Sequence, residues 1–121
     1  MEMFAGNAEI THLAYRYNLK AMQPFDLKYG IDLLKKGNRD LWKQSQTKYK
    51  PLVVVIETDC NPWNIFNENL NYAGKDRMDE LNELRDQHRP LVKLGVNACW
   101  QQIEHNNLFL MENPAGSLFW E

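Results

Sequence analysis

The chain has 121 residues, a net charge of −2 and an isoelectric point near 5.9. This length predicts a single domain over residues 1–121, and 44% hydrophobic with 25% charged residues excludes a disordered tail, a collagen-like repeat and a disulfide-dense mini-protein. The slightly acidic balance lacks the basic footprint that is typical of nucleic-acid-binding proteins.

The first forty residues indicate strands alternating with a helix. Residues 3–5 form a short apolar run that predicts a strand turning at Gly6, and Asn7 is the expected N-cap of the following helix. The core face of that helix is expected to consist of four apolar residues at helical spacing, namely Ile10, Leu13, Ala14 and Tyr17. A second strand is expected over residues 20–25, and residues 30–34 form either a very short strand or a turn.

The middle of the chain contains the clearest strand. Asn38 is the expected cap of a helix that runs to about residue 49, with Leu41, Trp42 and Ser45 facing inward. Residues 52–56, Leu-Val-Val-Val-Ile, then form a continuous apolar run that is mostly β-branched. Such a run is typical of a strand that is buried on both faces of a parallel sheet.

The last fifty residues predict two helices and a strand. A loop to about residue 75 precedes an amphipathic helix over residues 78–84, and Pro90 is expected in the first turn of another helix. His88 and His105 are expected to be exposed on these helices. Residues 108–111 form the last predicted strand.

The alternation of strands and helices predicts an α/β fold. We expect a Rossmann-like three-layer domain with a mostly parallel sheet of four to five strands. In such sheets ligands bind beyond the carboxyl ends of the strands, near the point where the strand order reverses. Polar residues gather at these expected strand ends: Gly6 with Asn7, Asp26, Asp32, Thr58 to Cys60, and Glu112 with Asn113.

The residue types at the first two strand ends suit a nucleoside-containing ligand. Gly6 permits close approach of a ligand to the backbone, and Asp26, twenty residues later, can accept hydrogen bonds from ribose hydroxyls. Either residue is also compatible with an ordinary turn, and so is Asp32. NAD is disfavoured because the three-glycine fingerprint is missing.

The later strand ends carry a thiol and a carboxylic acid. Cys60 is either a nucleophile or a small half-buried residue, and Glu112 is either its acidic partner or a solvated turn residue. A metal site is not expected, because the two cysteines and three histidines show no close ligand spacing.

Taken in chain order, these segments resemble class I S-adenosylmethionine-dependent methyltransferases, and among them the DNA cytosine carbon-5 methyltransferases. Residues 2–11, Glu-Met-Phe-Ala-Gly-Asn-Ala-Glu-Ile-Thr, are similar to the first family motif, F-A-G-x-G-G-x-S. Asp26 matches the acidic residue that holds the cofactor ribose, and Cys60 aligns with the Pro-Pro-Cys nucleophile motif. Glu112, followed by Asn-Pro, resembles the Glu-Asn-Val motif. The later parts of the family pattern have no counterpart, so the chain is expected to be a truncated cofactor half.

The resemblance implies S-adenosylmethionine as cofactor and a cytosine in nucleic acid as substrate. Cys60 would add to carbon 6 of the cytosine, and Glu112 would hydrogen-bond the ring at N3. The cofactor would be held by residues at four strand ends, namely Phe4, Ala5, Gly6, Asn7, Asp26, Asp32 and Thr58.

The sequence also departs from the family pattern. Ala8 and Glu9 replace two motif glycines, and Thr58 with Asp59 replaces the two prolines before the cysteine. A catalytically inactive methyltransferase-fold interaction or assembly module is therefore the alternative hypothesis. A third hypothesis is a small nucleic-acid-binding accessory that uses Trp63 and the basic stretch over residues 35–50, which is otherwise a solvated helix face.

The remaining expectations concern partners and location. No basic leader and no apolar run of about 18–20 residues is present, which predicts no membrane segment and an intracellular protein, in cytoplasm or nucleus. The strand over residues 108–111 would be an unpaired edge, so we expect a homo-oligomer or a partner chain that completes the sheet.

Overall fold

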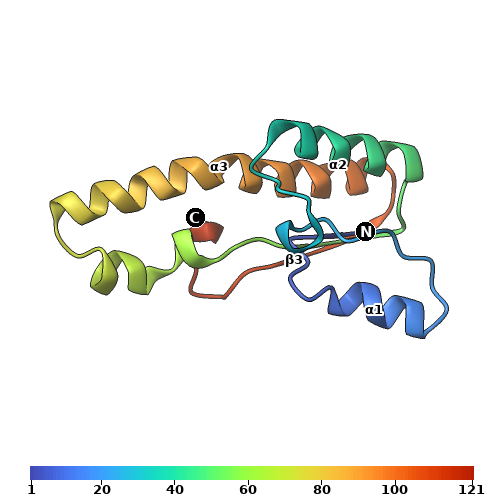
Figure 1. Ribbon diagram of the computed structural model, residues 1–121, viewed down its shortest axis with the longest axis horizontal. Coiled ribbons are helices and arrows are strands. Elements are labelled where there is room, and N and C mark those ends of the chain that lie inside the picture. Colours follow the sequence, from blue (N-terminus) through green and yellow to red (C-terminus); the bar gives the residue numbers. More distant parts are fainter.

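The computed structural model describes residues 1–121 and contains three strands and three longer helices (Figure 1). In chain order these are β1 (Glu2–Met3), α1 (Glu9–Arg16), α2 (Lys36–Tyr49), β2 (Val53–Glu57), α3 (Lys75–Glu104) and β3 (Leu108–Glu112). Four short helical turns complete the chain, at Leu27–Tyr29, Asn61–Trp63, Asn67–Asn71 and Leu118–Trp120. None of the helices has the length and apolar character needed to cross a membrane.

The sheet is parallel throughout, with strand order β1-β2-β3. This confirms the predicted α/β class, but the sheet has three strands and not four to five. Where a strand was expected over residues 20–25, a single parallel bridge joins Phe25 to Met3. Pro24 has no backbone N–H to donate to a ladder, which limits pairing there. Residues 30–34 form a turn.

The helices lie on both faces of the sheet, with α2 and α3 on one side and α1 on the other (Figure 1). The main core fills the side of α2 and α3. There Val54 and Ile56 of β2 pack with Trp42 of α2 and Leu94 of α3. Trp42 is fully buried and meets the Phe25 ring edge-on, with ring centroids 4.9 Å apart.

Helix α1 is oriented differently from the prediction. Ile10, Leu13 and Tyr17 were expected in the core, but they are 38%, 45% and 75% exposed. Thr11 is the buried residue of this helix, because the carboxylate of Glu2 accepts hydrogen bonds from both its backbone N–H (2.8 Å) and its hydroxyl. This polar contact, and not the apolar stripe, sets the face of α1 that meets the sheet.

The other two helices also differ in detail from expectation. Helix α2 begins at Lys36 and not at Asn38, and Leu41 is largely exposed while Trp42 is buried as predicted. The two helices expected around residues 78–84 and after Pro90 are one continuous helix, α3, with Pro90 inside it. A proline inside a helix costs about 3 kcal/mol. The burial of apolar residues from Leu91 onward against the sheet offsets this cost.

Candidate cofactor and substrate site

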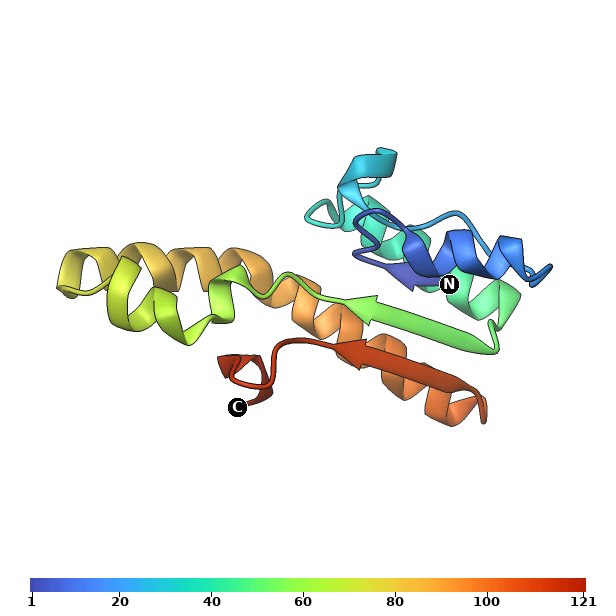
Figure 2. The same cartoon turned by 90° about the horizontal axis from the view of Figure 1, so that it is seen from below.

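The carboxyl ends of all three strands lie at one edge of the sheet, because the strands are parallel (Figure 2). From β1 the chain passes outward to Phe25, on the side of β1 away from β2, and then returns across β1 to form β2. The order of pairing therefore reverses between β1 and β2. In open α/β sheets the crevice at such a point is the usual place for a nucleotide.

The turn after β1 has an unusual backbone. Phe4, Gly6 and Ala8 all adopt positive φ angles, of 59°, 50° and 54°. For the two residues other than glycine, this conformation costs roughly 1–2 kcal/mol each. The backbone N–H of Phe4 donates to the carbonyl of Phe25 at 2.8 Å, which joins the turn to the next chain segment.

The carboxylate of Asp26 stabilises this turn with two hydrogen bonds. One oxygen of its carboxylate accepts a hydrogen bond from the backbone N–H of Gly6 at 3.1 Å, and the other accepts from the backbone N–H of Lys28 at 2.8 Å. The predicted pair of Gly6 and Asp26 is thus in direct contact. Each carboxylate oxygen has a second lone pair, so Asp26 retains the capacity to accept hydroxyl donors.

Asn7 and Asp32 take local roles near this turn. The side-chain oxygen of Asn7 accepts a hydrogen bond from the ammonium of Lys28, and Ala8, not Asn7, occupies the N-cap position of α1. Asp32 accepts from the backbone N–H of Leu34 at 2.9 Å and lies 4.0 Å from the ammonium of Lys35, which fits the reading of Asp32 as a turn residue.

The structure leaves open space beside the first turn, where the resemblance to the family places the cofactor ribose. A Cβ added to Gly6 would meet no atom within 4 Å, so the space beside it is open. Ala8, which replaces a motif glycine, is buried and directs its methyl group into the protein and not into this open space. Glu9, which replaces the other motif glycine, places a negative charge in the first turn of α1, and this charge is unfavourable for a carboxylate bound there.

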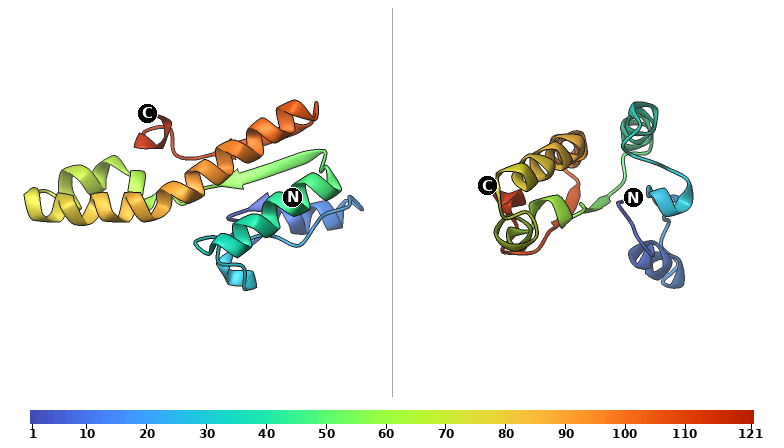
Figure 3. Two further views of the ribbon diagram at one scale, coloured as in Figure 1. Left: turned by 90° about the horizontal axis from the view of Figure 1, so that it is seen from above. Right: turned by 60° about the vertical axis from the view of Figure 1, so that its left-hand side comes forward.

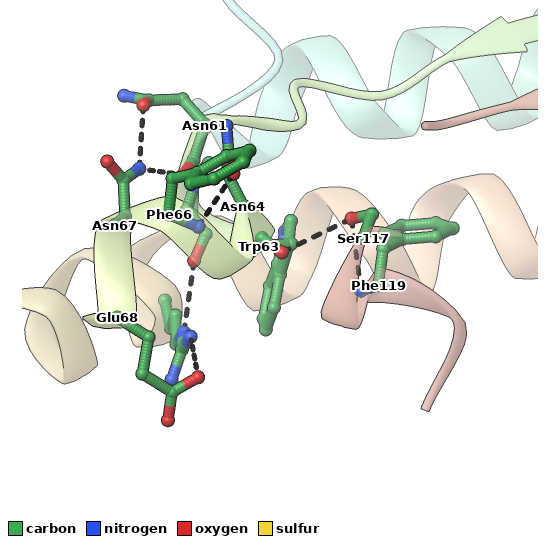
Figure 4. A network of polar contacts seen from close by, with 10 residues as sticks. Asn61, Trp63, Asn64, Phe66, Asn67, Glu68, Ser117 and Phe119 are labelled. Carbon is green, nitrogen blue, oxygen red and sulfur yellow. Dashed lines mark hydrogen bonds and ion pairs between the residues drawn. The ribbon is translucent and has the colours of Figure 1, made fainter. Parts of the chain in front are cut away.

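Cys60 lines a cavity of about 220 Å³ beyond the ends of β2 and β3. The other lining residues come from the segments that follow these strands, namely Asn64, Ile65, Phe66, Pro114, Gly116 and Ser117. An isolated antiparallel bridge between Asn64 and Ser117 holds the two segments together, and the Ser117 hydroxyl donates to the carbonyl of Trp63 (Figure 4). The cavity is smaller than the roughly 300–1,000 Å³ of typical ligand pockets.

Glu112 is not among the residues that line this cavity. It ends β3 directly opposite Glu57 of β2. Side chains alternate along strands, so the register places Glu112 and Glu57 on the same face of the sheet as Glu2, the face of α1. Burial raises the pKa of Glu57, and the neighbouring charges of Glu2 and Glu112 raise it further. These carboxylates are not arranged as metal ligands.

Thr58 is buried, and its hydroxyl lies 4.0 Å from the position a Cβ of Gly95 would take, so it faces α3 and not the open edge. Its carbonyl accepts a hydrogen bond from the side-chain amide of Asn113 at 2.9 Å, which links the ends of β2 and β3. The Thr58 hydroxyl and the Asn113 amide oxygen are buried with no hydrogen-bond partner in the chain.

Helix α3 contributes two residues near this site that the sequence did not single out. The His88 side chain was expected to be exposed but is only 18% exposed. Its imidazole lies 3.8 Å from the carboxylate of Asp59, the residue that precedes Cys60 in the sequence. Arg85 donates to the carbonyl of Pro62 at 3.0 Å and lies 3.5 Å from the carboxylate of Glu68. The spacing of three residues between Arg85 and His88 is the signal that both lie on one helix face.

No protein-family model matches this chain, and no curated protein or solved structure matches it. Function therefore has to be inferred from the carboxyl edge of the sheet and from the motifs located there.

Proposed function

We propose that this chain is a methyltransferase-like domain that binds S-adenosylmethionine at the turn after β1. The observation that carries the proposal is the contact between the Asp26 carboxylate and the Gly6 backbone, located where the strand pairing reverses. A glycine turn beside an acidic residue at this point of a parallel sheet is the arrangement that nucleoside cofactors use. The proposal includes a Rossmann-like sheet in which Phe25 marks a fourth strand.

In this proposal the ribose hydroxyls donate to the free lone pairs of Asp26, and the open side of Gly6 accommodates the cofactor against the backbone. Phe4, Ala5 and Asn7 surround the same turn, and Asp32 lies further along the chain after it. S-adenosylmethionine supplies a methyl group when bound.

Cys60 is the proposed nucleophile toward a cytosine of a nucleic acid. As a thiolate, its sulfur would bond to carbon 6 of the ring, and carbon 5 would then take the methyl group and leave S-adenosylhomocysteine. Loss of the carbon 5 proton to water would expel the thiolate and restore the ring. The cavity of about 220 Å³ beside Cys60 suits a single ring better than a whole nucleoside.

The test is titration calorimetry with S-adenosylmethionine. The wild-type chain is expected to bind one equivalent, and Asp26→Ala is expected to lose at least about 1.4 kcal/mol of binding, a tenfold change. Asp40→Ala, on the exposed side of α2, is the matched control. Its carboxylate pairs only with Lys36, so binding should not change. Absence of binding at millimolar cofactor, or equal affinity in Asp26→Ala, contradicts the proposal.

The second candidate is a module of the same fold that binds the cofactor without catalysis. It is favoured by the position of Glu112, which faces the α1 side of the sheet while Cys60 lines a cavity beyond the strand ends. Methyl transfer to cytosine-containing DNA or RNA, lost in Cys60→Ser, supports the enzyme. Cofactor binding with no methyl transfer supports the module.

The nucleic-acid contact proposed for the basic stretch has fewer free cations than the sequence suggests. Arg39 donates to the carbonyls of Leu33 and Leu34, and Lys36 pairs with Asp40. Lys43 and the lysines at the end of α2 remain as candidate phosphate contacts. The free edge of β3 keeps a second chain among the proposed partners.

A further inference from the structure

The face of the sheet on the α1 side carries an exposed apolar surface, which we call the open corner. It consists of one flank of α1 and the adjoining face of β2 and β3. Its five residues are between 38% and 75% exposed, namely Ile10, Tyr17, Val53, Leu108 and Leu110.

The contacts of Glu2 and the strand register place these five residues around one corner. Thr11 points from α1 to the sheet, and Ile10 and Tyr17 lie about 100–120° around the helix from it, so they point sideways. In a right-handed crossover this flank of α1 is the one nearer to β2. Val53 and its register partner Leu108 lie on the same face of the sheet as Glu2.

No helix covers β3 on this face, and β2 is exposed there only at its first residue, Val53, because Val55 is buried. Seen from below, β2 and β3 lie in full view beside α1 (Figure 2), and in the end-on view α3 and α1 lie on opposite sides (Figure 3, right). Parallel sheets are normally covered on both faces, and their strands are apolar on both faces for that reason. The exposed part consists of β3 and the first residue of β2, and β3 is about 16 Å long, which matches one helix of about three turns.

The carboxyl end of the open corner is acidic. Glu57 and Glu112 are register partners there, and neither forms an ion pair with any residue of the chain. Partial burial raises the carboxyl pKa of Glu57, and the neighbouring charges of Glu2 and Glu112 raise it further. A positive charge or free N–H groups at this end would relieve the repulsion.

Helix α1 provides the precedent within the same molecule. It begins at the carboxyl edge, and the sheet-face carboxylate of Glu2 accepts the backbone N–H and the hydroxyl of Thr11 in its first turn. Glu57 and Glu112 lie on the same face of the next two strands, two residues closer to the carboxyl ends than the level of Glu2. A helix laid beside α1 in the same direction would place its N-terminus, the positive end of its dipole, over these two carboxylates.

We propose that the open corner binds an amphipathic helix of another polypeptide, parallel to α1, with its apolar stripe on Leu108 and Leu110 and a basic first turn over Glu57 and Glu112. This surface is distinct from the proposed cofactor turn at Gly6 and Asp26. The partner is recognised by its apolar stripe and by positive charge at its N-terminus.

The test uses two labelled synthetic fifteen-residue peptides with the same apolar stripe, which differ only in having lysine or glutamate in the first turn. Fluorescence anisotropy is read against the full chain, with the helicity of both peptides measured by circular dichroism. The lysine peptide is expected to bind about three- to tenfold more tightly, the effect of a charge at a helix terminus. Leu110→Asp, a change at a half-exposed residue, should abolish binding of both peptides.

Glu112→Lys is expected to reverse the preference, and Glu104→Lys is the control with the same charge change on α3, where the preference should persist. No binding of either peptide at 1 mM, or binding that Leu110→Asp leaves intact in a folded chain, overturns the proposal. Sedimentation of the wild-type chain and of Leu110→Asp measures whether the open corner instead joins two copies of the chain. A wild-type dimer that Leu110→Asp dissociates assigns the open corner to a second copy and also overturns the proposal.

Discussion

Replacing Gly95 with alanine is expected to destabilise the protein, although alanine is the better helix former. Gly95 lies in α3 where the helix meets the sheet. A Cβ there would lie 3.0 Å from the terminal methyl of Met111 and 3.2 Å from a methyl of Ile56, both closer than ordinary contact. Alanine gains about 1 kcal/mol of helix propensity. Overpacking of a filled core costs roughly 1–3 kcal/mol, so the expected net loss is about 1 kcal/mol.

Gly37 is the matched control. It lies in the first turn of α2, and a Cβ there would meet no atom within 4 Å. Gly37→Ala should therefore stabilise the protein by about 0.5 kcal/mol. Urea denaturation followed by circular dichroism measures both, and a change of 1 kcal/mol moves the midpoint by about 0.5–1 M. Equal midpoint shifts of the same sign in the two variants would refute the close contact of α3 with the sheet.

Three further predictions concern the backbone, a buried charge and the first turn. Lys50 is exposed with φ of 44° at the end of α2, so Lys50→Gly should raise the free energy of unfolding by about 0.5–1 kcal/mol, while Lys43→Gly within the helix should lower it by about 1 kcal/mol. The folded-state pKa of Glu57 is raised, so ionisation of this carboxyl opposes folding above that pKa and has no effect below the unfolded value. Glu57→Gln should therefore stabilise the chain at pH 7, and the gain in urea denaturation should vanish by about pH 4. Asp26→Ala should lower the free energy of unfolding by about 1–2 kcal/mol because it removes the acceptor of two backbone N–H groups, and an unchanged urea midpoint would contradict that role.

The strands could be predicted from the sequence where a run of apolar, β-branched residues by itself favours a strand. The β-branched run before Glu57 forms the central strand, in which Val54 and Ile56 are buried. The apolar run after residue 107 forms the parallel strand beside it, although most of its side chains are exposed. The strand expected over residues 20–25 is reduced to one bridge at Phe25, where a proline precedes it. Pro90, by contrast, does not interrupt its element. Helix α3 continues past it because the residues that follow are buried against the sheet.

The orientation of α1 was not predictable from its apolar spacing. Its buried face is set by the hydrogen bonds between Glu2 and Thr11, residues nine positions apart on different elements. The stripe expected to be the core face is exposed, and two of its residues, Ile10 and Tyr17, form the flank of the open corner. A single-sequence pattern identifies an apolar face but not the surface that covers it.

The site was predictable where it depends on strand ends. Parallel strands place Gly6 and Asp26 at one edge, and the two residues are in contact. The pairing of Cys60 with Glu112 depended instead on which face of the sheet a strand residue takes. Glu112 lies two residues after Leu110 on β3, so both side chains face the α1 side of the sheet. The sequence predicts this direction once the register of β3 is known.

The most direct test of the proposed cofactor site is an amide NMR titration of the isotopically labelled chain with S-adenosylhomocysteine, the demethylated form of the cofactor. Saturable shifts are expected to centre on the turn after β1 and on Asp26, with the amides of Gly6 and Lys28 among the largest because both donate to the Asp26 carboxylate. A spectrum that stays unchanged at millimolar ligand, or shifts confined to α2, would show that the cofactor does not bind at this turn.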